Sequence, residues 1–219
     1  RAGPEIGVAS TKAFTAQLTV LLCFAVALAR AKEQIDEARA EAIHAEIQAL
    51  PGLVGKALGL FDTIRPVAQQ LSQAKSVLYL GRGALYPLAM EGALKLKEIS
   101  YIHAEAYASG ELKHGPIALI DEDMPVVVMA PRDGLFDKTV SNMQEVMARK
   151  GKVILISNRE GLTEAGHGVW DTIEMPDVSD AVAPILYAIP AQLLAYHTAV
   201  AKGTDVDQPR NLGKSVTVE

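Results

Sequence analysis

Residues 76–100, SVLYLGRGALYPLAMEGALKLKEIS, place an apolar run, a glycine-rich turn and a helical pattern one after another. The run 76–80 predicts a short buried strand, and Gly81-Arg82-Gly83 predicts a tight turn. Pro87 is a residue favoured in the first turn of the helix that follows. A strand, a turn and a helix in this order form the repeating unit of a parallel α/β sheet.

The same alternation continues along the chain. Further strands are expected at 125–130, 152–157 and 170–175, and further helices at 133–150 and 181–202. Residues 101–108 fit either a strand or a helix. The sequence therefore predicts an α/β fold, a doubly wound parallel sheet covered by helices on both faces, with flavodoxin-like winding.

Three helices are expected upstream of this unit. They cover residues 12–32, 35–50 and 55–73. Ser10 or Thr11 is the expected cap of the first helix, Pro51 and Gly52 are expected to end the second, and Pro66 is expected to kink the third. The apolar run 18–29 within the first helix is too short to span a bilayer, and we expect it to be a buried helix.

Composition limits the class of partner. The chain has 219 residues, of which 49% are apolar and 21% charged, with a net charge of −5 and a pI near 5.6. We therefore expect neither nucleic acid nor membrane as a partner. The single Cys23 fits a reduced, cytoplasmic protein, and the absence of CxxC and HExxH predicts no metal site. A start at Arg1, without methionine, indicates a fragment.

The helix after the glycine turn carries a column of charge. At about 100° per residue, Glu91, Lys95 and Glu98 fall on one narrow stripe. The alternative reading is a solvated ion pair on a wet helix face. The remaining circumference is mostly apolar, so we expect the column to lie beside a packed surface or a cleft. There a carboxylate's pKa can rise towards neutrality, which suits proton transfer.

Two further features of the sequence each allow two interpretations. His114 precedes Gly115-Pro116, a chain reversal from which an imidazole can project into a cavity, although a lone surface histidine is equally common. The turn 81–83, at the carboxyl end of a strand, could bind an anion with its N–H groups. A Gly-x-Gly turn, however, is more often a matter of backbone geometry alone.

Three segments together resemble one protein family. They are EIGVASTKAFTAQLTVLL (5–22), EGALKLKEISYIHAEAYASGELKHGPIALID (91–121) and KGTDVDQPRNLGKSVTVE (202–219). In this order they resemble the C-terminal isomerase (SIS) part of the bacterial glucosamine-6-phosphate synthases, the glutamine:fructose-6-phosphate aminotransferases (isomerising). The resemblance implies a remnant of a first SIS domain with connecting helices at 1–61, a second SIS domain at 62–209 and a catalytic C-terminal loop at 210–219.

The same resemblance implies an activity, the conversion of fructose 6-phosphate and glutamine-derived ammonia to glucosamine 6-phosphate for amino-sugar synthesis. His114 would transfer the ring-opening proton, Lys214 would form an imine with the open ketone, and Glu98 would move a proton between C1 and C2. Lys95 would balance charge on a hydroxyl or enolamine.

The resemblance also implies substrate contacts and partners. Val8, Ser10 and Gly213 are the implied sugar-binding residues, and Gly213 stands where the family has alanine. The implied partners are a sugar phosphate, a second subunit that supplies the histidine of a homodimer, and an N-terminal glutaminase domain; no metal or organic cofactor is needed. The phosphate-binding loop of the family belongs to the first SIS domain, so we expect the chain alone to be inactive.

Two other functions remain open from the sequence. One is a different SIS enzyme, such as a fructosamine-phosphate deglycase, against which the ending DQPRNLGKSVTVE argues. The other is a non-catalytic SIS module that senses a sugar phosphate, which has no need of Glu98, His114 and Lys214 together.

Overall fold

The computed structural model describes residues 2–215. A five-stranded, all-parallel sheet with the order β2-β1-β3-β4-β5 forms its centre. The strands are β1 (Ser76–Gly81), β2 (His103–Ala108), β3 (Pro125–Met129), β4 (Lys152–Asn158) and β5 (Asp171–Met175). The order 2-1-3-4-5 is that of flavodoxin-like winding, which confirms the predicted fold class.

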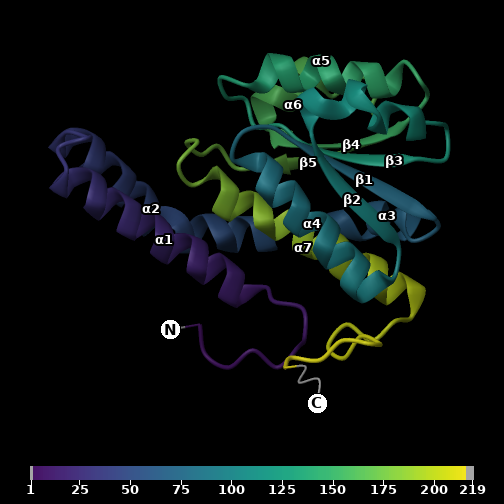
Figure 1. Cartoon of the computed structure of the whole chain (residues 1–219), viewed down its shortest axis with the longest axis horizontal. Helices are drawn as coiled ribbons and strands as arrows, with labels where there is room; N and C mark the ends of the chain where they lie inside the picture. The colour runs from purple at the N-terminus through teal and green to yellow at the C-terminus, as the bar shows by residue number, and fades with distance from the viewer. Residues whose placement is uncertain (1, 216–219) are drawn as a thin grey trace.

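Helices cover both faces of the sheet (Figure 1). Because side chains alternate along a strand, Val77 and Tyr79 face one helical layer while Leu78 and Leu80 face the other. The first layer contains α3 (Phe61–Leu71), α4 (Leu85–Ser100) and α7 (Ala183–Lys202). The second contains α5 (Phe136–Met147), α6 (Arg159–Ala165) and the 3-10 turns η1 (Ser109–His114) and η2 (Pro116–Leu119). The sequence predicted all of these α-helices except α6, and it predicted neither of the two 3-10 turns.

The course of α4 decides where the charged column lies. The helix starts at the carboxyl end of β1 and packs so closely on the sheet that a Cβ on Gly92 would lie 2.8 Å from the Tyr79 ring. It ends where Tyr101 takes a left-handed backbone (φ 61°), two residues before β2 begins. The last turn of α4 therefore lies at the amino edge of the sheet, whereas η1 follows β2 at the carboxyl edge.

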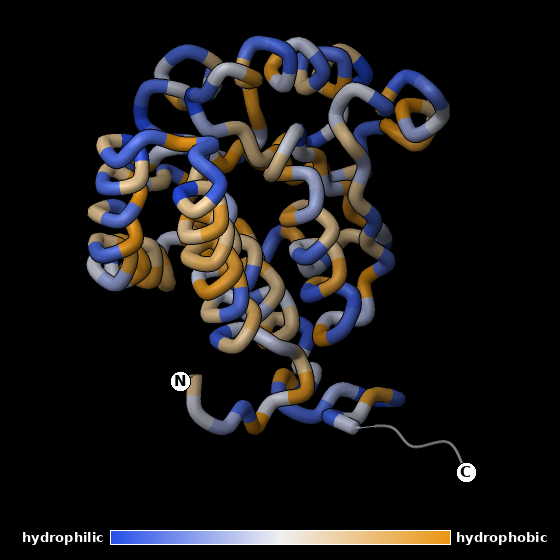
Figure 2. Tube along the Cα trace, turned by 60° about the vertical axis from the view of Figure 1, so that its left-hand side comes forward, coloured by the Kyte–Doolittle hydropathy of each residue, from blue (hydrophilic) through white to orange (hydrophobic). Residues whose placement is uncertain are grey.

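The first two helices project from the sheet domain (Figure 1). They are α1 (Lys12–Ala31) and α2 (Glu37–Leu58), and α1 packs on α2 through Leu18 and Leu22. The expectation of a buried helix at 18–29 is wrong: no α1 residue is buried within residues 2–215, and Val20 and Phe24 are 66% and 64% exposed. Hydrophobic residues run along the open side of α1 (Figure 2), and no described element covers that side.

Two properties of α1 differ from the sequence expectations. Cys23 is exposed rather than enclosed in an apolar helix. The helix is also 20 residues long, so by length and composition alone it is able to cross a membrane. The expectation from the sequence considered only the run 18–29, which Thr19 interrupts, and therefore took the segment to be too short.

The boundaries of α2 were also mispredicted. The helix runs through Pro51 and ends at Leu58, and α3 then carries Pro66 in its interior. A proline removes one backbone donor from a helix, but apolar packing can outweigh that loss. Leu50 and Ala57, on either side of the proline, are both buried against the body of the protein.

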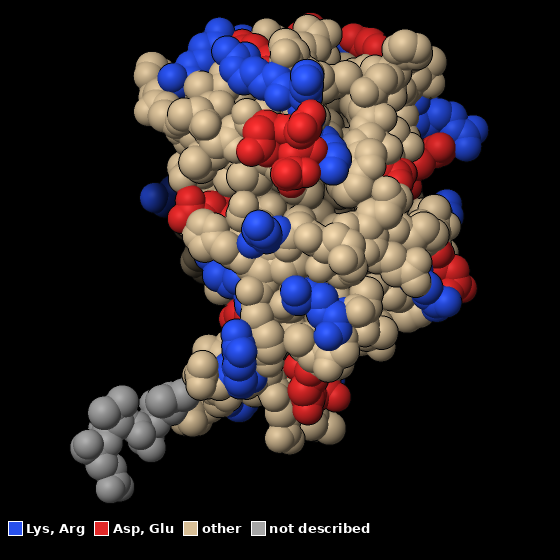
Figure 3. Space-filling model, turned by 90° about the vertical axis from the view of Figure 1, so that its right-hand side faces the viewer, with Lys and Arg blue, Asp and Glu red and all other residues tan. Residues whose placement is uncertain are grey.

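Charges of both signs share the face drawn in Figure 3, where Lys and Arg groups lie next to Asp and Glu groups. This is an ordinary mixed surface on the side that the view presents.

Candidate active site

The predicted charged column is present on α4 and is centred on a buried lysine. Lys95 Nζ lies 2.6 Å from Glu98 Oε2 and 3.5 Å from Glu91 Oε1, and only 5% of the Lys95 side chain is exposed. An ammonium group this deeply buried needs compensating charge, which the two carboxylates supply. The column therefore lies against a packed surface, as the apolar neighbours predicted, and is not a solvated ion pair.

Glu91 completes this group, although no catalytic role was predicted for it from the sequence. Burial raises the pKa of the Glu91 carboxyl, the Lys95 charge opposes that rise, and the neighbouring Glu98 charge adds to it. The carboxylates of Glu91 and Glu98, which share the Lys95 ammonium, therefore differ in their surroundings. Glu98 is the more exposed of the two, with 20% of its side chain accessible against 13% for Glu91.

Lys95 lines a pocket of about 310 Å³ between α4, α7 and the N-terminal segment. Glu5 and Gly7 form its wall on the N-terminal side, and Gln192 and Tyr196 of α7 close the opposite side. Apolar side chains, among them Ile6, Ile99 and Val206, complete the lining, so the pocket presents a few polar groups on a mostly apolar wall, as small-molecule sites usually do.

Lys214 meets the N-terminal segment beside this pocket. Its Nζ donates to the carbonyl oxygen of Gly7 at 2.9 Å and to that of Val8 at 3.4 Å, and it pairs with Glu5 Oε2 at 3.4 Å. The backbone N–H of Val8 in turn donates to the Asp207 carbonyl at 2.9 Å. The fold thus joins the C-terminal tail to the segment 5–8, and it brings Lys214 and Val8, both predicted site residues, into contact.

Glu5 organises the start of α1, and sequence reasoning missed it. Ser10 Oγ donates to Glu5 Oε2 at 3.0 Å, while the N–H groups of Thr11 and Ala13 donate to Glu5 Oε1 at 2.8 and 3.4 Å. The predicted capping by a Ser10 or Thr11 side chain is wrong, because the remote carboxylate satisfies these donors instead. An acid placed shortly before a Ser-Thr helix start was the available signal.

These contacts set the charge state of Glu5. Burial acts to raise the pKa of the Glu5 carboxyl, but the Thr11, Ser10 and Ala13 hydrogen bonds and the Lys214 charge outweigh it and lower the pKa to about 2. The carboxylate next to Lys214 therefore keeps its charge at neutral pH.

The C-terminal tail also follows the end of α4. The Arg210 guanidinium lies 4.2 Å from the Tyr101 ring centroid, and the Arg210 N–H donates to the Tyr101 hydroxyl at 2.8 Å. Together with Glu98 and Leu212 these residues line an open pocket on the outer side of α4. Gly213, a predicted site residue, lies exposed between this stacked pair and Lys214. Residues 216–219 of the predicted catalytic loop lie outside the described residues.

His114 lies apart from these residues. It is the last residue of η1, at the carboxyl edge of the sheet, and it is exposed. The six residues of β2, roughly 20 Å of strand, separate η1 from the end of α4 where Glu98 lies. One copy of the chain therefore brings Lys95, Glu98, Lys214, Val8 and Ser10 to one region, and it leaves His114 at the opposite edge.

The close approach of the backbone explains why glycine follows in the turn after β1. A Cβ on Gly81 would lie 2.2 Å from the Leu85 carbonyl oxygen, so only glycine allows this close approach at the start of α4. The charged column, Lys214 and Val8 gather instead near the amino edge, away from the turn. The carboxyl-edge position that parallel sheets favour for ligands therefore does not describe this group of residues.

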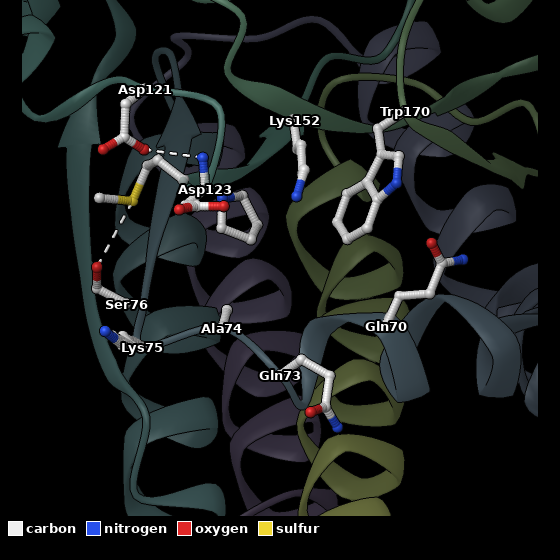
Figure 4. A pocket seen from close by; sticks show the side chains of 11 residues that line it. Gln70, Gln73, Ala74, Lys75, Ser76, Asp121, Asp123, Lys152 and Trp170 are labelled. Carbon is white, nitrogen blue, oxygen red and sulfur yellow. Dashed lines mark hydrogen bonds between the residues drawn. The ribbon is translucent and has the colours of Figure 1, made fainter.

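A second polar pocket, of about 480 Å³, opens at the amino ends of β1, β3 and β4 (Figure 4). Lys152 stands beside Trp170 there, with Nζ 5.6 Å from the centroid of the indole ring. Gln70 in the last turn of α3 points towards Trp170, whereas Gln73, beyond the helix end, points away from both. None of the predicted site residues lines it. Within residues 2–215 no three His, Cys, Asp or Glu side chains form a group that could hold a metal ion.

Comparisons with known proteins agree with this architecture. The SIS domain family model matches residues 70–202. The chain is 62% identical over 218 residues to the glutamine–fructose-6-phosphate aminotransferase (isomerising) of Zymomonas mobilis and 60% identical to that of Brucella abortus. All of this chain aligns in both cases, but it spans only 36% of the length of either relative.

Solved structures show the same relationship. The C-terminal domain of glucosamine-fructose-6-phosphate aminotransferase from Francisella tularensis superposes with a TM-score of 0.92 and 48% identity, over 94% of this chain and 58% of that one. A glucosamine-6-phosphate deaminase from Thermotoga maritima, at 23% identity and a TM-score of 0.71 over 97% of this chain and 58% of that one, shares the fold alone. With the family model matching most of its length, the chain belongs to the SIS domain family.

Proposed function

We propose that the chain is the isomerase part of a glutamine:fructose-6-phosphate aminotransferase (isomerising), which acts on fructose 6-phosphate. The observation that carries this proposal is the position of Lys214, whose ammonium touches Gly7 and Glu5 in the wall of the pocket that Lys95 lines. A lysine amine and an ion-paired carboxylate near one pocket provide the groups that aminating a ketose requires. The identity of 62% over the whole chain supports the assignment.

The proposed chemistry begins at the carbonyl carbon C2 of the open-chain sugar. The neutral amine of Lys214 adds to C2 and water leaves, which gives an imine between the lysine and the sugar. Ammonia then adds to the same carbon and displaces the lysine amine. Glu5, beside Lys214, provides a fixed negative charge that favours the protonated imine over the neutral one.

The second step moves a proton between C1 and C2. A carboxylate at Glu98 removes a proton from C1, which gives an enolamine, and a proton is then delivered to C2 to leave an aldehyde at C1. The 2.6 Å contact with Lys95 fixes the direction of the Glu98 carboxylate. The same ammonium offers positive charge where the enolamine oxygen develops negative charge.

Ring opening is assigned to His114, which we propose to act from a second subunit. Within one chain the imidazole lies at the opposite sheet edge from Glu98, so this role requires a homodimer in which η1 of one copy reaches the α4 end of the other. The imidazole can take the proton of the C2 hydroxyl and deliver it to the ring oxygen as the bond between C2 and that oxygen breaks, which leaves a ketone at C2 and a hydroxyl at C5.

The rest of the enzyme lies outside this chain. The relatives are nearly three times as long, which leaves room for a glutaminase domain that supplies ammonia and for a first SIS domain that binds the phosphate. The SIS match at 70–202 supports the proposed domain at 62–209, and the boundaries at 61 and 210 stay predictions. A cytoplasmic location also stays a prediction. No observation favours a deglycase or a sugar-sensing module.

The complete gene product tests this function. We expect it to form glucosamine 6-phosphate from fructose 6-phosphate and glutamine, and we expect Lys214→Ala to abolish that reaction. Borohydride reduction in the presence of fructose 6-phosphate should attach the sugar covalently to Lys214, which peptide mass spectrometry detects. Turnover at the normal rate without Lys214 would contradict the imine route.

A further inference from the structure

The short turn η1, which ends at His114, is held from two sides by polar side chains of other elements. We propose that Arg82 and Asn142 are positioning residues that fix this turn, and through it the direction in which His114 leaves the surface. This proposal rests on the function proposed for His114. It adds the residues through which the fold sets the direction of the imidazole. Lys113 and Glu145 form a second, outer attachment of the same turn.

Arg82 provides the inner attachment. It follows β1, and its guanidinium donates to Asn142 Oδ1 on α5 at 2.8 Å. The same guanidinium lies against η1, because a Cβ built on Gly110 would be 3.2 Å from Nη2 and 3.3 Å from Nη1. The side chain thus fills the space between the turn and α5, and glycine at 110 lets it approach the backbone this closely.

The outer attachment lies next to the histidine itself. Lys113 Nζ pairs with Glu145 Oε1 at 2.8 Å, and Glu145 is three residues after Asn142, on the same side of α5. Between the two attachments Leu112 is fully buried in the core beneath the sheet. The turn is therefore fixed at Gly110, Leu112 and Lys113, directly before His114.

The turn depends on these contacts because its own backbone gives it little rigidity. A 3-10 turn has poorer hydrogen-bond geometry than an α-helix and rarely persists alone. After His114 the chain changes direction at Gly115, whose φ of 146° is a conformation that side chains rarely adopt. Leu112 anchors the turn in the core, and the Arg82 and Lys113 contacts fix its orientation on either side of that anchor, directly before the exposed imidazole.

The polar contacts around η1 also lower the folding stability more than a purely structural contact would. Arg82 Nε, Ser109 Oγ and Glu145 Oε2 are buried without a hydrogen-bond partner among the described residues, and each such group lowers stability. Apolar side chains would fill the same space without that penalty. Proteins tend to retain such arrangements where a functional position depends on them.

The test uses the full-length enzyme with Arg82→Met, which keeps an unbranched, flexible side chain and removes the guanidinium donors. Because small misplacements of a catalytic group lower the rate strongly, we expect kcat to fall about 10-fold or more while KM for fructose 6-phosphate changes less than about twofold. Arg82→Lys should recover part of the loss. Arg65→Met is the matched control, because it removes an exposed ion pair with Asp62 on α3, and it should leave kcat unchanged.

A double-mutant cycle separates positioning from general destabilisation. In a His114→Ala background, Arg82→Met should lower the residual kcat less than about twofold, because Arg82 acts through the histidine. An equal loss in both backgrounds would overturn the proposal, as would normal kcat in Arg82→Met. Asn142→Ala, which keeps Arg82 but removes its acceptor, gives the same test if Arg82→Met fails to fold. Full activity of His114→Ala itself would instead overturn the role of the histidine, and the positioning proposal with it.

Discussion

Lys214 Nζ donates a 2.9 Å hydrogen bond to the carbonyl oxygen of Gly7, across a sequence separation of 207 residues. The contact joins the last described segment of the chain to one of the first, and both lie at the same end of the molecule (Figure 1). A lysine carried on a tail without regular secondary structure needs such fixed acceptors, since the tail alone does not define its direction. The position of the proposed imine lysine therefore depends on the segment 5–8.

We expect the charge of Glu5 to stabilise this junction in a pH-dependent way. Its pKa is lowered from 4.5 to about 2 in the folded chain, so the stabilisation is complete above pH 4.5 and is lost as the pH falls towards 2. Glu5→Gln should lower the free energy of unfolding by on the order of 1–2 kcal/mol at pH 6, because a partly exposed carboxylate contributes less than its full shift implies.

Urea unfolding at pH 6, 4 and 3 checks this expectation. The difference between wild type and Glu5→Gln should shrink as the pH falls, while Glu41→Gln, an exposed carboxylate on α2, should have little effect throughout. A difference that stayed the same from pH 6 to pH 3 would mean that Glu5 acts through its shape and not through its charge.

Glu98→Gln tests the assignment of the general base. Glutamine can still accept a hydrogen bond from Lys95, and Glu91 still balances the ammonium, so we expect a stability loss of only about 1 kcal/mol. The full-length enzyme should nevertheless lose about 10²- to 10⁴-fold in kcat, because the amide cannot take the C1 proton. Steady-state kinetics and calorimetry measure the two effects separately.

The matched control is Glu37→Gln, which removes an exposed carboxylate paired with Arg30 at the start of α2. Its kcat should remain within about twofold of wild type, since exposed ion pairs contribute little. A Glu98→Gln enzyme with normal kcat would remove Glu98 from the mechanism.

Much of the fold follows from local patterns in the sequence. The strand at 76–81 and the helix after it each follow from the pattern of residues within that element. The predicted sheet order follows from the way short apolar runs alternate with helical segments along the chain. The Glu91-Lys95-Glu98 column was predictable for the same reason, since three positions on one helix fix their own geometry.

Features that depend on distant segments were not predictable from local patterns. Glu5 pairs with Lys214 across 209 residues, which no local pattern indicates, whereas its contact with Thr11 had a local signal in the acid before the helix start. Pro51 indicated a helix end, but buried neighbours keep α2 continuous. The apolar composition of α1 indicated burial, yet its open side has no cover within residues 2–215, and composition alone cannot say which segment would cover it.

Subunit complementation tests where His114 acts. If the histidine of one copy serves the Glu98 of the other, co-expression of full-length His114→Ala and Glu98→Gln chains creates mixed dimers with one intact site each. With random pairing about half of the dimers are mixed and one of their two sites works, so activity should recover to about a quarter of wild type. Confirmed mixed dimers without activity would place both groups in the site of a single chain.

The final prediction concerns the 219-residue chain on its own. Its sheet is covered by helices on both faces, and the groups proposed for proton transfer and imine formation are already in place, so we expect a folded protein. We place the phosphate site of the proposed enzyme, however, outside this chain, which spans only 36% of the length of its relatives. Binding of the remote phosphate is what holds the reacting carbons against the catalytic groups, and without it the chemical step loses that support. We therefore expect fructose 6-phosphate to bind no tighter than about 1 mM, near −4 kcal/mol, and we expect no turnover when ammonia is supplied. Calorimetric titration and a coupled assay for glucosamine 6-phosphate measure both quantities, and micromolar binding or clear turnover would show that this chain contains a complete site.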